Sequence, residues 1–513
     1  MNSETYETNE PRKGFSFPTG GRELFLLILM ALSGLGMCNS LLFGGANLGF
    51  AIFTVLMLLF TGIYLLISGV KPTFYSLLVV ILCIVIAAAF GRSNDDLVKF
   101  IMAVFLFFGV NIGLCLMARQ NLWQGGTFRT LADAPVCLGR MGFGKLPHAI
   151  GGLFAASRRS GGLWRKGGAF ILGLCVAIPL VAVVISLLTS ADAAFSGLLD
   201  NLPELDFWEM FLTLFLGIPF VLLFYTRGVA LRHTQRKEPK APRSCNLLSP
   251  ITVNTVLCAV SAVYVLYLVS QLAYFVGGFS GILPKEYTMA EYARRGFFEM
   301  AVLCGINLAL TALSTFLVRK YGRINLLTKL LCLFIGLVTL FLVCTASAKM
   351  FLYIGSFGLT RMRVLTQIVM LFLALVDLVA MVWLFAPKLP YMKFVVVAAL
   401  LIGAVTIWVD VDTVVAHYNT EAYLSGRMEE IDVTYLCDLN HAAVPYLAKL
   451  AEEAPDETEA DQAMFYLRHM RVETEDFRDW NYATGLAKKF LPAPGEAADV
   501  VTGELSPSVQ EAQ

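Results

Sequence analysis

Long apolar stretches recur along the chain up to residue 408, separated by shorter polar connections. We expect each stretch to cross a bilayer as an α-helix, because about 20 apolar residues match the hydrocarbon thickness and backbone groups in lipid have no water to bond. The pattern predicts an all-α fold, a polytopic transmembrane helical bundle. Its eleven expected spans are residues 24–43, 48–66, 74–90, 98–117, 169–188, 207–225, 251–276, 297–318, 330–348, 364–385 and 394–408.

A different pattern follows the last span. Shorter amphipathic stretches at 431–450, 460–470 and 479–491 predict a small C-terminal helical domain outside the membrane. Pro445 is expected to interrupt the first stretch, and residues 452–461 are expected to form a solvated acidic link to the second. The composition after Pro492, rich in Pro, Gly, Glu and Ser, predicts disorder.

These patterns divide the chain into six expected parts. They are a polar N-terminus (1–23), a four-span bundle (24–117), a basic loop (118–168), a seven-span bundle (169–408), an acidic helical tail (409–491) and a disordered end (492–513).

Composition narrows the class of protein. Hydrophobic residues make up 57% of the chain and charged residues 15%, whereas soluble domains carry about 25% charged residues. This balance excludes a soluble enzyme, a disordered chain and a small disulfide scaffold. The net charge of +1 conceals an asymmetry, because residues 410–513 hold 21 acidic and 7 basic side chains while residues 1–409 hold 17 and 32.

Lysine and arginine predict the orientation of the bundle. With a cytoplasmic N-terminus, the inward segments hold 24 basic residues and the outward segments eight, as the positive-inside rule requires. An odd number of spans then places the acidic tail outside the cytoplasmic membrane. The basic loops 118–168 and 227–249 are expected to contact anionic lipids of the bilayer surface, and a nucleic-acid partner is not expected.

Motifs for catalysis or for metal binding are scarce. Gly278, Ser280 and Gly281 resemble the GxSG of rhomboid-type serine proteases, but all five histidines fall outside the spans, so the serine lacks a base. The sequence has neither a phosphate-binding GxxxxGK[ST] loop nor a zinc-binding HExxH helix. The cysteines lie mostly in apolar runs without metal-ligand spacing. We therefore predict no catalytic residue, no cofactor and no metal, and a protein that is not an enzyme.

One carboxylate lies inside an expected span. Asp377 is near the middle of residues 364–385, where an ionisable side chain costs at least about 2.5–3.5 kcal/mol. One interpretation is a site coupled to a proton or cation. The other is a structural carboxyl, hydrogen-bonded to a polar residue of a neighbouring span, for which the candidates are Asn111, Asn254, Asn307 and Gln271.

Two polar segments are expected at the outer surface. In the first, Glu291, Arg295 and Glu299 follow an i,i+4 spacing beside Arg294, and paired arginines can hold a carboxylate or a phosphate. The second, residues 349–363, is expected to be too polar and glycine-broken to span, which favours a re-entrant or interfacial turn. We hypothesise that Arg294, Arg295, Glu299 and Arg361 converge on an anion or lipid headgroup; the alternative is that the two segments anchor separate helices.

Three stretches resemble the signatures of a bacterial family of polytopic membrane proteins known as a domain of unknown function. They are EYARRGFFE (291–299), MFLYIGSFGLTRMRV (350–364) and residues 415–450. The resemblance covers roughly residues 169–450 and leaves out the first four spans. It implies a multi-pass protein of the bacterial cytoplasmic membrane. It marks Arg294, Arg295, Glu299, Tyr353, Thr360 and Arg361 as family positions and implies no reaction or ligand.

Three functions are considered for these features. A membrane enzyme acting on lipid headgroups would need a base or nucleophile near Arg295, for which the candidates are Glu299, Tyr292 and Glu291. A non-enzymatic sensor or scaffold of the cell envelope fits the folded tail, which would bind a protein partner, and the scarcity of catalytic groups. A transporter or channel for an anionic or lipid-like substrate fits Asp377 and the outer arginines, although no internal repeat is evident. We expect the sensor or scaffold and keep the transporter or channel as the alternative.

Overall fold

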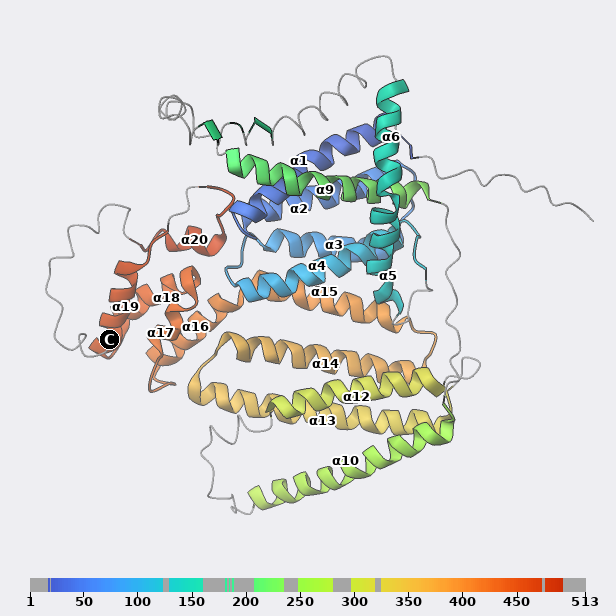
Figure 1. Cartoon of the computed structure of the whole chain (residues 1–513). Coiled ribbons are helices and arrows are strands. Elements are labelled where there is room, and N and C mark those ends of the chain that lie inside the picture. The colour runs from blue at the N-terminus through green and yellow to red at the C-terminus, as the bar shows by residue number, and fades with distance from the viewer. Residues whose placement is uncertain are drawn as a thin grey trace, which may run out of the picture.

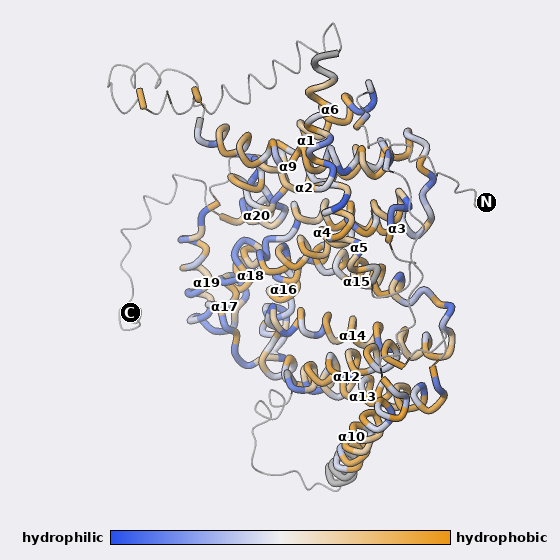
Figure 2. Tube along the Cα trace, turned by 45° about the vertical axis from the view of Figure 1, so that its right-hand side comes forward, coloured by the Kyte–Doolittle hydropathy of each residue, from blue (hydrophilic) through white to orange (hydrophobic). Residues whose placement is uncertain are grey.

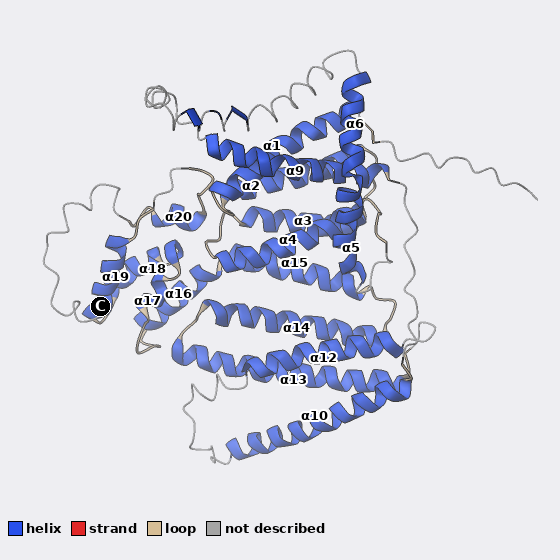
Figure 3. Ribbon diagram, in the orientation of Figure 1, coloured by secondary structure: helices blue, strands red, loops and turns tan. Residues whose placement is uncertain are grey.

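A computed structural model describes residues 17–18, 20–122, 129–159, isolated positions between 180 and 188, 207–234, 248–279, 297–318, 324–472 and 476–491. Within these ranges every regular element is a helix (Figure 3). Nine of the described helices are long and apolar enough to cross a membrane, and α3 is a shorter apolar helix. Helices therefore occupy ten of the eleven expected spans, and most of the remaining one, 169–188, lies outside the described residues.

The first group of helices contains α1 (Gly21–Phe43), α2 (Leu48–Ile67), α3 (Phe74–Ala89), α4 (Asp96–Met117), α9 (Phe207–His233) and α15 (Tyr391–Val409) (Figure 1). Glycines bring their axes close together. A Cβ added at Gly34 would lie 2.7 Å from Val221 of α9, and one added at Gly403 of α15 would lie 3.0 Å from Met102 of α4. One continuous apolar core joins the whole group.

The second group contains α10 (Pro250–Phe279), α12 (Phe297–Val318), α13 (Leu326–Phe357) and α14 (Arg361–Phe385), with a core of its own. Side-chain hydrogen bonds cross this core: Tyr264 Oη donates to Asn307 at 2.6 Å, and Asn307 Nδ2 donates to Thr339 at 3.0 Å. The spatial grouping differs from the expected division at residues 117 and 169, because α9 and α15 pack with the first four helices.

The two ends of the bundle differ. At one end α5 (Arg129–Cys137) and α6 (Leu146–Arg159) pack near the start of α1 and the end of α9; we call it the basic end. At the other lie α16 (Val411–Leu424), α17 (Val433–Cys437), α18 (Val444–Glu453), α19 (Glu457–His469) and α20 (Tyr482–Ala487) (Figure 1). We call residues 411–491 the capping domain and this end the capped end. Helix α6 ends at Arg159 on the basic end, and α9 begins at Phe207 on the capped end.

Hydropathy separates the bundle from the capping domain (Figure 2). Exposed side chains of the long helices are apolar, such as Phe100, 67% exposed, and Leu266, 72% exposed. This surface suits a lipid solvent, in which apolar side chains need no cover. The chain is therefore a multi-pass membrane protein, with a smaller C-terminal set of helices outside the hydrophobic bundle.

The stretch 431–450 is interrupted at Pro445 as expected, because α17 ends at Cys437 and a separate helix, α18, begins at Val444 with Pro445 in its first turn, where its missing N–H is harmless. A second expectation for the capping domain was wrong. The acidic residues 452–461 are not a link, because α18 runs to Glu453 and α19 begins at Glu457. Val415, Leu436, Leu447 and Leu450 are fully buried and continue the core of the first helix group. The domain is thus packed onto the bundle and not merely tethered to it.

The expectation of a re-entrant turn over residues 349–363 was also wrong, and the turn at the end of the spans is limited to residues 358–360. Helix α13 continues without a break to Phe357, and only Gly358, Leu359 and Thr360 separate it from α14. Met350 and Ile354 are buried in the second core, so one face of this polar-looking segment packs like the rest of the span. Gly355 lies within this helix, and a Cβ added there would meet no atom within 4 Å.

Candidate functional site

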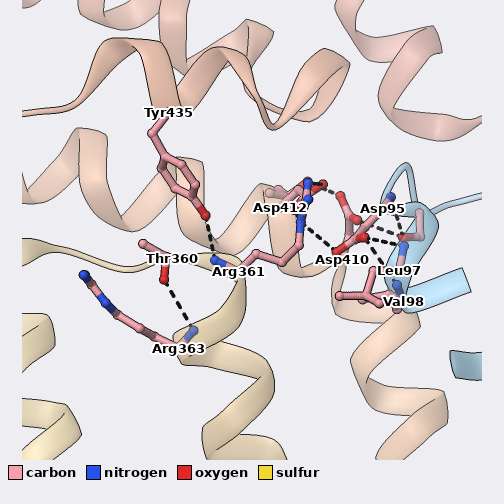
Figure 4. A network of polar contacts seen from close by, with 11 residues as sticks. Asp95, Leu97, Val98, Thr360, Arg361, Arg363, Asp410, Asp412 and Tyr435 are labelled. Carbon is pink, nitrogen blue, oxygen red and sulfur yellow. Dashed lines mark hydrogen bonds and ion pairs between the residues drawn. The ribbon is translucent and has the colours of Figure 1, made fainter. Parts of the chain in front are cut away.

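Arg361 is the centre of a polar network at the capped end (Figure 4). Its Nε donates to Asp412 Oδ1 at 2.7 Å and its Nη2 donates to Asp412 Oδ2 at 2.8 Å, a bidentate pair. Asp95 Oδ2 lies 2.8 Å from the same Nε. The backbone N–H of Arg361 donates to Tyr435 Oη at 2.7 Å. One residue thus connects α14 with α4, α16 and α17.

Three aspartates supply the negative charge of this network, and each stands at the N-terminus of a helix. Asp95 caps α4 by accepting from Leu97 N at 2.8 Å, Asp410 precedes α16 with φ +59°, and Asp412 lies in the first turn of α16. Helix N-termini favour carboxylates. We call Asp95, Asp410 and Asp412 the aspartate cluster; all three are at least 97% buried.

The aspartate cluster carries more negative charge than Arg361 can neutralise. The single hydrogen on Nε is directed at Asp412, so Asp95 Oδ2 has no hydrogen-bond donor among the described residues. Ser93 Oγ donates to Asp410 at 3.2 Å, and the buried Lys99 donates to Asn47 at 2.6 Å nearby. Burial raises the pKa of Asp412 to about 6, against the opposing effect of Arg361. Asp412 therefore titrates closer to neutral pH than an ordinary carboxylate does.

A second contact fixes the turn before Arg361. Asn419 of α16 accepts a hydrogen bond from Leu359 N at 2.7 Å and donates one to Leu359 O at 2.9 Å. Gly358 has φ +69°, and a Cβ there would lie 2.7 Å from Asn419 Oδ1. The glycine is required both for the left-handed backbone and for the close approach of α16.

Residues 476–482, which we call the bridging segment, lie across the ends of α1, α2, α4 and α9. Arg478 forms ion pairs with Glu209 of α9 and with Asp476, and its Nη1 donates to Asn39 Oδ1 at 2.8 Å. Leu48 N donates to Trp480 O at 3.0 Å, and Tyr482 N donates to Gly91 O at 2.9 Å. The capping domain thus completes backbone hydrogen bonds of two connections of the bundle.

A cavity of about 710 Å³ opens beneath the bridging segment. Its floor is apolar and its rim polar, with Asn39, Thr213, Asp476 and Arg478 on one side. The apolar lining residues are Ala31, Leu32, Leu35, Gly36, Phe53 and Phe477. The charges on the rim pair with one another, so this cavity offers no unpaired cation for an anionic ligand.

Asp377 lies in the interior of the bundle, 2% exposed, and its Oδ2 has no hydrogen-bond partner among the described residues. The expected asparagine partners bond elsewhere: Asn111 to Phe107 O, Asn254 to Thr328 and Asn307 to Tyr264 and Thr339. The side chain of Gln271 is outside the described set. The interpretation of Asp377 as a carboxyl held by one of these three asparagines was therefore wrong.

Glu299 and Tyr353, the other expected site residues that the structure describes near this end, form no hydrogen bond or ion pair with Arg361. Arg294 and Arg295 lie outside the described residues, so their convergence with Arg361 stays a prediction. Glu299 is exposed in the first turn of α12, whereas the ion pairs of Arg361 run to Asp95 and Asp412. Tyr353 lies 4.3 Å beneath the guanidinium of Arg363, which donates to Phe357 O and Gly358 O.

Sequence reasoning missed the aspartate cluster, Tyr435 and Asn419. The sequence did contain an indication of the aspartate cluster. Asp95 precedes one expected span and Asp410 and Asp412 follow another, so all three are predicted on the outer side of the membrane, where Arg361 is also predicted. Among the residues that the structure describes, no set of three His, Cys, Asp or Glu side chains is arranged to hold a metal ion. The Arg361 network can neutralise buried carboxylates and hold the helices that it connects in fixed positions. Its described residues include no nucleophile paired with a base.

Comparison with known proteins adds a family but no activity. No curated protein and no solved structure matches the chain. A family model described as a domain of unknown function, DUF4153, matches residues 53–450. The match begins within α2, so the expected extent of the resemblance, 169–450, was too narrow. It includes the whole Arg361 network but ends before the bridging segment. Because the match covers most of its length, the chain belongs to the DUF4153 family of unknown function.

Proposed function

We propose that the protein is a non-enzymatic sensor or scaffold of the bacterial cell envelope, in which the capping domain receives a protein partner and the bundle holds it at the membrane. The observation that carries this proposal is the bidentate bond between Arg361 and Asp412. It ties the first helix of the capping domain to the start of a transmembrane helix, and Asp95 ties the same arginine to α4. A change of position in the domain is thereby passed to two helices of the bundle.

The proposed orientation places the basic end in the cytoplasm and the capping domain outside. Arg119, Arg140, Lys145 and Arg232 belong to the basic end, where the positive-inside rule puts cationic side chains. These residues would contact anionic lipids of the inner leaflet. The capping domain holds an excess of acidic residues, which suits the opposite side.

Helix α19 is the surface we propose for the partner. Met464 and Phe465 are 39% and 42% exposed, and the Phe465 ring lies 4.1 Å from the ring of His469. Glu457 and Glu459 stand in the first turn of the same helix. An exposed aromatic residue on a helix whose first turn carries carboxylates suits a protein partner with an apolar residue and nearby basic residues.

The test is a photocrosslinking amino acid placed at Phe465 in the full-length chain in cells. We expect a discrete protein adduct of defined mass that is absent when the same group is placed at Gln462, an exposed polar position on α19. The purified adduct partner should then bind the full-length protein saturably, and Phe465→Ser should weaken that binding at least tenfold. Adducts that are the same at both positions, or absent at both, would contradict the proposal.

A transporter remains the second candidate because of one observation. The carboxyl of Asp377 is buried between spans, and its Oδ2 accepts no hydrogen bond from the described residues. Gly336 of α13 packs close to it, since a Cβ added at Gly336 would lie 3.5 Å from Asp377 Oδ1. Such a carboxyl is a candidate carrier of a proton. Its neighbours Met381 and Cys304 are apolar, which favours a dry interior over a conduction path.

Proteoliposomes loaded with a pH-sensitive dye separate the two candidates. Transport predicts proton flux, with or without a chloride gradient, that Asp377→Asn abolishes and Asp438→Asn, an exposed carboxylate of the capping domain, leaves unchanged. Flux equal to that of protein-free vesicles would remove the transporter and leave the sensor or scaffold.

A further inference from the structure

The cavity beneath the bridging segment follows one face of α1, from the capped end into the membrane-spanning part of that helix. Leu32, Gly36 and Asn39 line it together, at the spacing of three and four residues that shares a helix face. Asn39 stands about one turn before the end of α1, and Ala31, at the other end of the cavity, lies about 12 Å deeper at the α-helical rise. The cavity thus has a polar mouth and an apolar interior, the order in which a lipid places its headgroup and its chain.

The apolar part of the cavity is accessible from the surface of the bundle. Leu32 is 64% exposed, and Phe53 of α2 is half-buried. Between them Gly36 has no side chain to fill the space, and its backbone packs on the Phe53 ring, because a Cβ added there would lie 2.5 Å from Phe53 Cε1. Apolar surface that is open within a membrane span contacts lipid. The volume of about 710 Å³ lies within the roughly 300–1,000 Å³ of ligand sites, so an acyl chain is an occupant of fitting size and polarity.

Carboxylates outnumber cations at the mouth of the cavity. Arg478 forms ion pairs with both Glu209 and Asp476, so the described charges of this group sum to minus one. The side chain of Asp476 is 32% exposed and lines the cavity, which leaves its oxygens within reach of a headgroup at the mouth. A negative mouth repels an anionic headgroup and attracts an ammonium, which also donates hydrogen bonds to a carboxylate.

We propose that this cavity binds a bilayer phospholipid with a primary ammonium headgroup, such as phosphatidylethanolamine. One acyl chain lies over Leu32, Gly36 and Phe53, and the ammonium donates to Asp476. A choline headgroup carries the same positive charge but has no N–H to donate, and a glycerol headgroup leaves the lipid with a net negative charge beside the carboxylates. The site therefore prefers ethanolamine to choline and to glycerol headgroups. The inference does not depend on the proposed function of the capping domain.

Full-length protein in phosphatidylcholine nanodiscs tests the proposal. Two phospholipid probes with the same diazirine-bearing acyl chain, one with an ethanolamine and one with a choline headgroup, are each added as a small fraction of the lipid. Crosslinked residues are identified by mass spectrometry. We expect the ethanolamine probe to label residues 31–36 or Phe53 at least tenfold more than the choline probe does, whereas both probes label the exposed surface around Leu266 equally. Equal labelling of the cavity by the two probes, or labelling there no stronger than around Leu266, would overturn the proposal.

Variants separate the roles of the chain and the headgroup. Leu32→Trp places a larger side chain in the cavity and should reduce labelling of Phe53 by the ethanolamine probe at least fivefold, whereas Leu266→Trp, the same change on the exposed face of α10, should not. Asp476→Asn should reduce the preference for the ethanolamine probe at least fivefold, and Asp438→Asn, at an exposed carboxylate, should retain it. A preference that Asp476→Asn leaves unchanged contradicts the assigned ammonium contact. If a variant does not fold, the two probes on the unaltered protein still decide.

Discussion

Arg361 and Asp412 are 51 residues apart in sequence and form two parallel hydrogen bonds of 2.7 and 2.8 Å at the capped end of the bundle. The arginine begins a transmembrane helix, where the helix dipole alone disfavours a cation. The carboxylates around it reverse that preference. Arg361 is therefore stable at this position only with Asp412 beside it, and Asp412 needs the arginine to balance its charge. We expect substitutions of this pair to weaken the junction between the bundle and the capping domain.

Arg361→Ala should destabilise the protein by on the order of 3 kcal/mol, because it leaves Asp95 and Asp412 buried without their cation. The expected readout is a lower midpoint of thermal unfolding in detergent, followed by tryptophan fluorescence. Arg427→Ala is the matched control, since that side chain is exposed, donates to Ser425 Oγ and otherwise lies over the ring of Tyr418 at 5.8 Å, with no ion pair among the described residues. It should change stability by no more than about 0.5 kcal/mol. Equal midpoints for both variants would contradict the role of Arg361.

The stability of the protein should depend on pH through Asp412. Its pKa rises from 3.8 to about 6 on burial, so the folded state binds the proton more tightly than the unfolded state. The stability that this group contributes is fully present below about pH 4 and is lost as pH rises through about 6. Asp412→Asn should remove that loss, so the difference between its midpoint and that of the wild type should change between pH 4 and pH 7. A difference that stays constant over this range would refute the assignment.

Two glycines three residues apart should respond oppositely to alanine. Gly358→Ala forces a Cβ onto a residue with φ +69° and within 2.7 Å of Asn419 Oδ1, so we expect a loss of roughly 1–3 kcal/mol. Gly355→Ala fills open space inside α13 and should be neutral or stabilising by up to about 1 kcal/mol. Thermal midpoints of the two variants provide the comparison. Similar losses for both would mean that the turn before Arg361 is not held by Asn419.

Arg478→Ala should release the bridging segment. The ion pair with Glu209 and the bond to Asn39 are lost together, and the backbone bond from Leu48 N to Trp480 O is no longer held in place. Hydrogen–deuterium exchange should therefore accelerate at the amides of Leu48 and Tyr482, while amides in the middle of α1 keep their protection. Lys489→Ala, at an exposed position beyond α20, should leave all of these rates unchanged. Unaltered exchange at Leu48 in Arg478→Ala would show that the segment is held by other contacts.

The membrane helices could be predicted from sequence because their length and apolarity are local properties. The continuation of α13 to Phe357 could not, since Lys349, Gly355 and Ser356 resemble the end of a span. What extends the helix is burial of Met350 and Ile354 against neighbours distant in the chain. Tertiary packing thus outweighs local composition at this point.

The candidate site was predictable only in part. Arg361 stood out as a charge beside a span, but its partners depend on which connections meet at the capped end. Asp95 belongs to α4, far from Arg361 in sequence, and reaches it only because α15 packs between α14 and the pair α3 and α4. The packing of α9 and α15 among the first four helices cannot be predicted from hydropathy, because hydropathy indicates which segments are helices and not which helices are neighbours. Pairings across the bundle therefore had to come from the structure.

The bridging segment has a consequence for how the protein is made. Asn39 emerges early from the ribosome, yet the guanidinium that bonds to it belongs to Arg478, 439 residues later. Until residues 478–480 have been synthesised, the opening between α1 and α9 lacks its cover, and Leu48 N lacks the carbonyl that Trp480 provides. A chain interrupted before Arg478 would therefore leave this opening uncovered.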